Sequence, residues 1–340
     1  MPEDRVAIPK TGVAPTTVME WLNQCETNHE ICGSVKTTLD EGKDVFKIFL
    51  IDVVAKCLVQ TTYQDRRYVT LSYVWGRTNQ FKCSRANLDT LKGTQGLMKF
   101  YNKIPQTIRD GIDFVASIGE SYIWVDSLCI IQDDAIHKEE QISGMATIYG
   151  NSLFTIVAAS GQDANSGLSG VAGQPRRIDM RPLPSRPGLF IIPKPSLLDD
   201  FYQTLYNDRA WTFQERLLSR RCIYLLNNQA YFQCRVGILS EDCDDSFGTE
   251  LPNLKPPLDI PSPSVTELSI LNPLLVGRSL GTEAIYFAQY LKLAYEYLSK
   301  ELSNPSDIVH AFSGILEYFG NQQGWTFVHC LPVQFLDAAL

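Results

Sequence analysis

Residues 104–126, IPQTIRDGIDFVASIGESYIWVD, contain the helix–strand unit that decides the fold. Apolar residues at positions 104, 108, 112, 115 and 118 follow the 3.6-residue period of a helix that faces a core. Pro105 suits the first turn of this helix, because its missing N–H has no intrahelical partner there, and Gly119 supplies a stop. The short run Tyr122–Asp126 (YIWVD) then predicts a buried strand with an acidic residue at its carboxyl end.

The alternation of strand and helix continues on both sides of this unit. Tyr68–Tyr73 (YVTLSY) predicts a strand before it, and His137–Tyr149 predicts a helix after it. Leu153–Ala159 (LFTIVAA) is apolar on both faces, which is typical of a central parallel strand covered by helices on each side. The order strand–helix–strand–helix–strand predicts an α/β fold with a doubly wound, mostly parallel sheet.

The flanking segments predict a small leader and a helical tail. The leader, residues 1–66, contains a helix at Val18–Thr27 and strand-like runs at Val45–Val53 and Lys56–Thr62. A helix at Asp208–Ser219, capped by Asn207 or Asp208, precedes two strands joined through Asn227-Asn228. We therefore expect a central α/β domain at 67–235 with a Pro-rich insertion at 162–200. A Pro-rich linker and helices at 282–302 and 306–318 make up the remainder, 236–340.

Composition excludes several classes of protein. The 340 residues are 44% hydrophobic and 20% charged, as in a packed soluble protein, and no membrane span or secretory signal is evident. A net charge of −8 argues against nucleic-acid binding, which needs a basic surface. The nine cysteines include no C-x-x-C pair, and their odd number argues against a disulfide scaffold. We expect reduced thiols in a cytoplasmic protein.

Candidate site residues follow the predicted strands at their carboxyl ends, where parallel sheets bind ligands. Glu215 lies on the same helix face as Trp211, four residues earlier, and an aromatic ring beside a carboxylate suits a flat base or a ribose. The competing interpretation places Trp75 and Trp124 in the core and Glu215 on a solvated helix face. The strand-end candidates are Ser72, Tyr73, Trp75 and Gly76 after the first strand, Asp126 and Cys129 after the second, and Ser160 after the third.

Common catalytic motifs do not occur in the chain. It has no phosphate loop, no G-x-S-x-G elbow and no H-E-x-x-H helix. A nucleophilic pair of Cys129 and His137 is conceivable, because an imidazole can activate a thiol, although a buried, inert cysteine is the alternative. Cys25, His29 and Cys32 offer three zinc ligands, but no fourth lies near in the sequence, so packing of a helix and turn is the favoured interpretation and no metal is expected.

Several segments together resemble the heterokaryon incompatibility (HET) domain of filamentous fungi. The leader WLNQCETNHEIC (21–32) also resembles the segment that often precedes this domain. The resemblance implies that the protein triggers programmed cell death in nonself recognition. It also implies a nonself-recognition partner protein and self-association of the chain. HCLPVQFLDAAL (329–340) resembles a family segment that normally continues, which implies a shortened C-terminus. The main segments are YVTLSYVWG (68–76), residues 104–134, QISGMATIYGNSLFTIVAASG (141–161), DRAWTFQERLLSRRCIYL (208–225) and SDIVHAFSGIL (306–316).

HET domains are in turn similar to Toll/interleukin-1 receptor (TIR) domains, which implies a TIR-like, flavodoxin-like sheet. Tyr68–Gly76 resembles the first TIR strand and its loop, and Ile123–Asp126 resembles the second strand with its terminal Asp. Trp211-x-x-x-Glu215 resembles the TIR W-x-x-x-E helix, whose Glu is catalytic in members that hydrolyse NAD+. NAD+ is then a substrate, and no cofactor is required.

In that activity, Glu215 would stabilise the charge that develops on the ribose when nicotinamide leaves. Trp211 or Trp75 would stack on a ring, and Arg77 or Arg209 would meet the pyrophosphate. Ser72, Gly76 and Ser160 would line the phosphate and ribose path.

Two rival functions are compatible with the same residues. The first is a non-enzymatic TIR-like module that signals by self-association, with the Pro-rich stretches 175–195 and 252–273 as partner surfaces. The second is a cysteine-dependent enzyme of secondary metabolism that uses Cys129 with His137.

Overall fold

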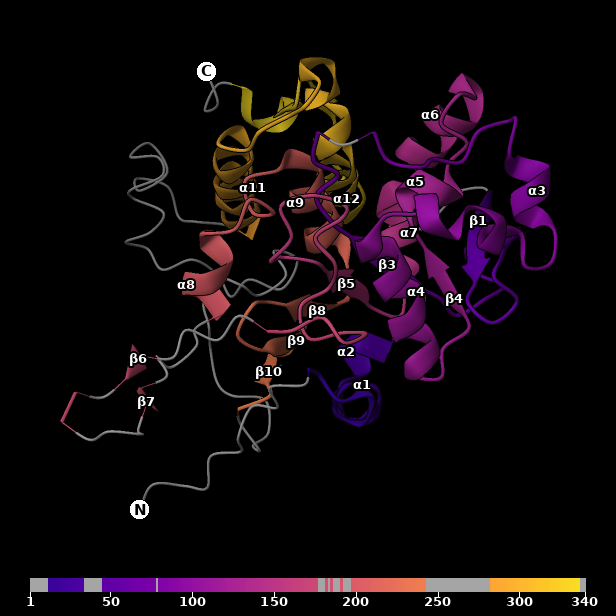
Figure 1. Cartoon of the computed structure of the whole chain (residues 1–340). Helices are drawn as coiled ribbons and strands as arrows, with labels where there is room; N and C mark the ends of the chain where they lie inside the picture. Colours follow the sequence, from indigo (N-terminus) through magenta and orange to yellow (C-terminus); the bar gives the residue numbers. More distant parts are fainter. Residues whose placement is uncertain are drawn as a thin grey trace.

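An eight-stranded mixed sheet organises the protein, with strand order β10-β9-β8-β5-β3-β4-β1-β2 (Figure 1). The structure, a computed structural model, describes residues 12–33, 45–77, 79–176, 181–182, 184–185, 190–191, 197–242 and 282–336. The strands of the sheet are β1 (Lys47–Asp52), β2 (Cys57–Thr62), β3 (Val69–Ser72), β4 (Tyr122–Trp124), β5 (Thr155–Val157), β8 (Arg221–Leu225), β9 (Ala230–Cys234) and β10 (Ile238–Ser240).

The centre of the sheet is parallel and its flanks are antiparallel. β3 pairs in parallel with β4 on one side and with β5 on the other, and β5 pairs in parallel with β8. The order β4-β3-β5-β8 corresponds to 2-1-3-4 along the chain, which is the order at the start of flavodoxin-like sheets. The topology reverses between β3 and β5, so ligands are expected at the carboxyl ends of these two strands.

The flanks show that strands from the N-terminal segment join the same sheet. β1 pairs antiparallel with β4 and with β2, while β8, β9 and β10 form an antiparallel ladder on the other side. The β8–β9 hairpin closes at Leu225 and Ala230, as the sequence predicts. Two further pairs, β6 (Arg181–Pro182) with β7 (Phe190–Ile191) and β11 (Phe327–Val328) with β12 (Leu331–Pro332), stand outside this sheet.

Helices cover both faces of the parallel centre, as the predicted α/β fold requires. On one face, α4 approaches closely, because a Cβ at Gly111 would lie only 3.5 Å from the side chains of Leu71 and Ile123. On the other face, α9 lies over β3 and places Glu215 against Ser72. The main helices are α1 (Pro15–Asn28), α2 (Glu30–Gly33), α3 (Leu88–Lys92), α4 (Gln106–Ser117), α5 (Asp126–Cys129), α6 (Ala135–Ser143), α7 (Met145–Asn151), α8 (Leu197–Tyr202), α9 (Ala210–Leu218), α11 (Thr282–Leu298) and α12 (Ser313–Gln323).

Several predicted helices have different bounds in the structure, and three of them differ for a visible reason. The helix expected at His137–Tyr149 is divided into α6 and α7 at Gly144, where any Cβ would lie 2.3 Å from the Phe46 ring. α9 begins at Ala210 with Arg209 as its N-cap, instead of Asn207 or Asp208. The second tail helix begins only at Ser313, after the short 3₁₀ segments Pro305–Ile308 and His310–Phe312. The Pro-rich stretch 252–273 and most of 175–195 lie outside the described residues.

The C-terminal helices stand beside α9, whereas α1 and α2 lie near β8 and β9 at the other end of the molecule (Figure 1). The contact with α9 is tight at Gly314 of α12, whose N–H donates to Oε1 of Gln214 at 2.8 Å. A Cβ at Gly314 would lie 2.9 Å from the Cβ of Ala146 in α7 and 2.6 Å from Leu218. Glycine at this position therefore permits the close approach of three helices.

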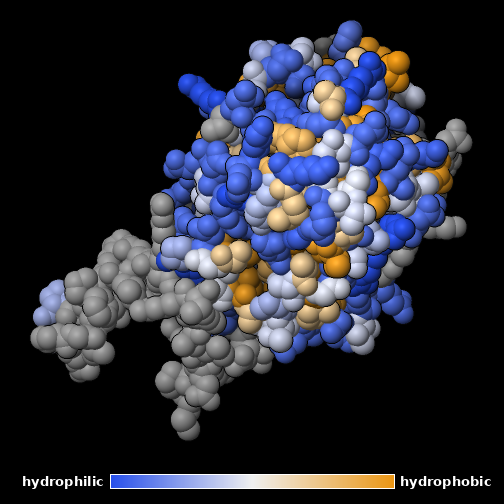
Figure 2. Space-filling view, turned by 45° about the vertical axis from the view of Figure 1, so that its right-hand side comes forward, coloured by the Kyte–Doolittle hydropathy of each residue, from blue (hydrophilic) through white to orange (hydrophobic). Residues whose placement is uncertain are grey.

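The face drawn in Figure 2 is largely hydrophilic, with small apolar areas scattered among charged and polar side chains. Scattered apolar residues of this kind are normal on a protein surface. Within the described residues, no helix combines the length and the apolar character needed to cross a bilayer.

We expect Gly314→Ala to lower the free energy of unfolding by about 1–3 kcal/mol, because the added methyl group overpacks the junction of α12 with α7 and α9. Urea denaturation followed by circular dichroism measures this change. Gly320→Ala is the matched control in the same helix, since its Cβ would meet only the Trp325 carbonyl oxygen at 3.4 Å. It should be neutral or stabilising by up to about 1 kcal/mol. Equal stability of the two variants would contradict the tight junction.

Candidate functional site

Glu215 lies inside the packed layer between α9 and β3, with only 6% of its surface exposed. The Ser72 hydroxyl donates to Oε2 of Glu215, and the same hydroxyl oxygen lies 2.5 Å from the Tyr206 hydroxyl. Ser72 is the last residue of β3, so this carboxyl group is held at the carboxyl end of the central strand. The interpretation of Glu215 as part of a solvated helix face does not fit this burial.

The Glu215 carboxyl group favours its protonated form. Burial, with a smaller contribution from the negative charge of Asp126, raises the pKa of Glu215 to about 8, although hydrogen bonds with Ser72 and Tyr149 oppose this rise. A buried carboxyl group of this kind exchanges a proton near neutral pH, which is the range in which acid–base and charge-stabilising groups work.

Asp126 is the second carboxyl group at this edge of the sheet. It begins α5 directly after β4, and it accepts hydrogen bonds from the Trp75 indole N–H at 2.7 Å and the Ser127 backbone N–H at 2.6 Å. Burial raises the pKa of Asp126 to about 6, against the opposing effect of these two donors. The Lys82 ammonium group lies 4.7 Å from the centre of the Trp75 ring. Trp75 is thus oriented by a carboxylate and covered by a cation.

The loops after β3 and β5 contact each other at the same edge. Gly76 has a φ of +71°, and a Cβ on it would lie 2.4 Å from Asp163, so glycine is required at this close approach. Arg77 follows on the exposed surface of the turn. Ser160, half-buried after β5, donates to the Leu225 carbonyl oxygen at 3.3 Å and so joins the ends of β5 and β8. The strand-end candidates therefore share one edge.

Tyr73, which follows Ser72, is buried and hydrogen-bonded beneath this edge. Its hydroxyl oxygen lies 3.0 Å from Ser127 Oγ and 3.2 Å from Gln80 Oε1, and its single proton can be donated to either of them. Burial raises the pKa of Tyr73 well above its ordinary value, so the phenol stays protonated. Its contacts support the Asp126 turn.

Trp211 and Arg209 are engaged with the C-terminal region. The Trp211 indole N–H donates to Asp307 at 3.4 Å, and Arg209 contacts Glu301 at 3.8 Å and donates to Ser303. Trp211 and Glu215 are four residues apart on α9, yet their side chains have different partners. The structure thus groups Glu215 with Ser72 and Asp126, and it groups Trp211 and Arg209 with the tail.

Cys129 and His137 also have separate partners. Cys129 is fully buried, and its sulfur accepts from the Val125 backbone N–H at 3.4 Å. Burial raises the pKa of its thiol far above the ordinary value, which disfavours a reactive thiolate. His137 Nδ1 accepts from the Ile131 backbone N–H at 3.2 Å. These contacts give no support to a nucleophilic pair.

One group of side chains in the described part of the chain could hold a metal ion, and it consists of Cys25, His29, Cys32 and Cys234. Their ligand atoms all lie within 4.8 Å of one another. The fourth ligand that the sequence lacks near Cys32 comes from β9, 205 positions after His29. Cys234 pairs with Arg221 at the start of β8, so this group lies at the amino end of the parallel strands, away from Ser72.

Two phenols beside Glu215, those of Tyr206 and Tyr149, were not among the residues predicted from the sequence. Both are fully buried, and burial raises the pKa of each well above its ordinary value. Tyr206 lies in the turn before α9, where no periodic pattern marks it. Tyr149 is the last residue of the helix predicted at His137–Tyr149, so only the packing of α7 on α9 reveals its polar contact.

Residues 68–215 match the family model of heterokaryon incompatibility protein (HET). The chain therefore contains a HET domain at these residues, as its motifs suggest, and the domain indicates a role in heterokaryon incompatibility. The match begins at Tyr68, next to β3, and ends at Glu215 itself. No curated protein and no solved structure matches the chain.

We expect Glu215→Gln to change how stability depends on pH. The pKa of Glu215 is raised from 4.5 to about 8 in the folded state, so its favourable contribution is complete below pH 4.5 and is lost as pH rises through about 8. Between the pKa of Asp126, about 6, and that of Glu215, about 8, the titration of Glu215 should lower the free energy of unfolding by up to about 1.4 kcal/mol for each unit that the pH rises. Glutamine cannot ionise and should flatten this slope.

Urea denaturation at pH 6, 7, 8 and 9 measures the slope for each variant. Glu20→Gln is the control, because Glu20 is exposed on α1 and should keep the wild-type slope. Parallel curves for wild type and Glu215→Gln would show that Glu215 is already ionised in the folded protein.

Proposed function

We propose that this HET-domain protein triggers programmed cell death in fungal nonself recognition by hydrolysing NAD+. The observation that carries the proposal is the convergence of Glu215, Asp126 and Ser72 at the carboxyl edge of the sheet, beside the reversal of topology between β3 and β5. Raised pKa values of two neighbouring carboxyl groups are characteristic of catalytic sites. The β4-β3-β5-β8 order also supports the TIR-like interpretation of the sheet.

The reaction breaks the bond between the ribose C1′ and the nicotinamide nitrogen. The electron pair of that bond leaves with nicotinamide, which becomes neutral, so no general acid is needed. Positive charge develops on the ribose, and a carboxylate beside the ring stabilises it more in the transition state than in the ground state. Water then attacks C1′ and gives up one proton, which leaves ADP-ribose and nicotinamide.

Glu215 is suited to this role once the substrate is bound. In the free protein its pKa is raised to about 8, mainly by burial. The cationic nicotinamide ribosyl group would favour the ionised carboxylate, because an opposite charge nearby lowers the pKa of an acid. Asp126, which remains partly exposed, would receive the proton of the attacking water. Trp75 would present to the substrate the ring face that Lys82 does not cover, and the exposed Arg77 would meet the pyrophosphate.

A second candidate function is a non-enzymatic module that signals by association with a partner protein or with further copies of itself. The burial of Glu215 favours it, since the carboxyl group with its contacts to Ser72 and Tyr206 would then stabilise the packing of α9 on β3. In this case the HET domain would act through its surface and would release no nicotinamide.

Incubation of the purified chain with NAD+, followed by chromatography of free nicotinamide, separates the two functions. We expect turnover in the wild type and a loss of about 100-fold or more in Glu215→Gln, which keeps the size of the side chain but removes its charge. Because the ionised form is needed, kcat/KM should rise with pH toward the pKa of about 8. Glu20→Gln, exposed on α1, should retain wild-type turnover.

The assay is run on dilute protein and on protein clustered through a multivalent tag, because association can be required for activity. Turnover by Glu215→Gln equal to that of the wild type would remove Glu215 from the mechanism. Absence of nicotinamide release in both the dilute and the clustered wild type would favour the non-enzymatic module.

A further inference from the structure

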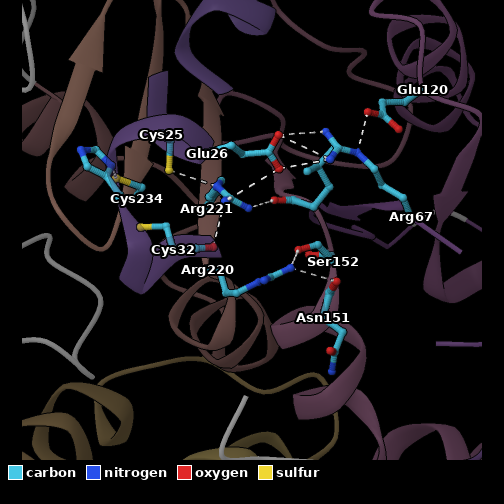
Figure 3. A network of polar contacts seen from close by, with 12 residues as sticks. Cys25, Glu26, Cys32, Arg67, Glu120, Asn151, Ser152, Arg220, Arg221 and Cys234 are labelled. Carbon is cyan, nitrogen blue, oxygen red and sulfur yellow. Dashed lines mark hydrogen bonds and ion pairs between the residues drawn. The ribbon is translucent and has the colours of Figure 1, made fainter. Parts of the chain in front are cut away.

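We propose that Cys25, His29, Cys32 and Cys234 bind a structural zinc ion that fixes the N-terminal helices to the central sheet. Cys25 lies on α1, His29 caps the end of that helix, Cys32 lies on α2, and Cys234 ends β9. The three sulfur atoms are almost completely buried. Figure 3 shows that the labelled side chains of Cys25, Cys32 and Cys234 gather around one point, with Arg221 beside them.

The geometry matches tetrahedral coordination. Zinc binds sulfur at about 2.3 Å and imidazole nitrogen at about 2.0–2.1 Å, which places two ligands of a tetrahedron about 3.6 Å apart for sulfur and nitrogen. Cys234 Sγ lies 3.5 Å from His29 Nδ1. All four ligand atoms lie within 4.8 Å of one another, so small side-chain rotations would bring them to coordination distance.

The surroundings of the sulfur atoms are those of metal-bound thiolates. Cys25 Sγ accepts from the Arg221 guanidinium at 3.1 Å, and Cys234 Sγ accepts from the Val236 backbone N–H at 3.4 Å. Donors of this kind orient the ligands of a metal and tune them. Three thiolates, one neutral imidazole and Zn²⁺ together carry one negative charge. The Arg221 guanidinium, itself only 2% exposed, places a positive charge beside this cluster and also lies 4.0 Å from the Glu26 carboxylate.

The ligand set also selects the metal. Thiolates and imidazole are the ligands of structural zinc sites, and four protein ligands leave no open position for catalysis. None of these cysteines forms a disulfide. A disulfide would use two of the three sulfurs and would leave the third sulfur and His29 without a common role. A zinc ion accounts for all four side chains.

The site would join segments that are far apart in the sequence. Arg221, 196 positions after Cys25, already donates to the Cys32 carbonyl oxygen at 2.8 Å and to the Leu153 carbonyl oxygen at 3.1 Å. Zinc would join the same segments, α1 and α2 with β9, through four further bonds at the amino end of the parallel strands. The N-terminal helices would then stabilise the sheet of the HET domain.

Metal content tests this proposal directly. The full chain, purified with a phosphine reductant and without chelators, should contain close to one zinc per molecule by inductively coupled plasma mass spectrometry. Cys234→Ser and His29→Ala should each lose most of this zinc. Cys83→Ser is the matched control, because Cys83 is equally buried but lies outside the cluster, and it should keep the full equivalent.

A cobalt readout keeps the test independent of how well the variants fold. Wild-type protein expressed in cobalt-supplemented medium should show the visible absorption of tetrahedral Co²⁺ and the charge-transfer band of thiolate ligands. Wild-type protein without zinc and without this spectrum would overturn the proposal. Full zinc retention in Cys234→Ser would also overturn it, as would a disulfide among these cysteines detected by mass spectrometry of the unreduced chain.

Discussion

The burial of the Glu215 carboxyl group between α9 and β3 is the constraint on which the candidate site depends. A polar group removed from water must keep hydrogen-bond partners, because an unpaired one costs about 1–3 kcal/mol. The Ser72 hydroxyl provides a donor from the last position of β3, and Tyr206 lies against the same hydroxyl. β3 therefore has two different faces. Leu71 packs on α4, while Ser72 forms a hydrogen bond with Glu215 of α9.

The two ends of the parallel strands carry different groups. At the carboxyl end, Glu215 and Asp126 lie among loops that follow β3, β4 and β5, and their raised pKa values bring both carboxyl groups close to neutral pH. At the amino end, Arg221 is buried among the Cys25 sulfur and the carbonyl oxygens of Cys32 and Leu153. The proposed site of NAD+ hydrolysis and the proposed metal site are thus separated by the length of the strands, so changes at the four metal ligands and at Glu215 can be tested independently.

The elements of the fold could largely be predicted from local patterns. α4 and the β8–β9 hairpin occur where periodicity and turn residues place them, since these signals act within a few residues. The division at Gly144 could not be predicted in this way, because the Phe46 ring that occupies the space beside it comes from another part of the chain. The partner of Trp211 is a similar case: helical spacing places it near Glu215, but Asp307 in the tail accepts its hydrogen bond.

Local patterns in the sequence are enough to predict the α/β alternation and the HET-domain segments, because each is encoded by residues adjacent in the chain. The tertiary structure alone decided which side chains meet. It brought Tyr206 and Tyr149 to Glu215, and it brought Cys234 to Cys25, His29 and Cys32. The reason is physical: strand register and helix packing fix contacts across about two hundred positions of sequence, a range over which no local period carries information.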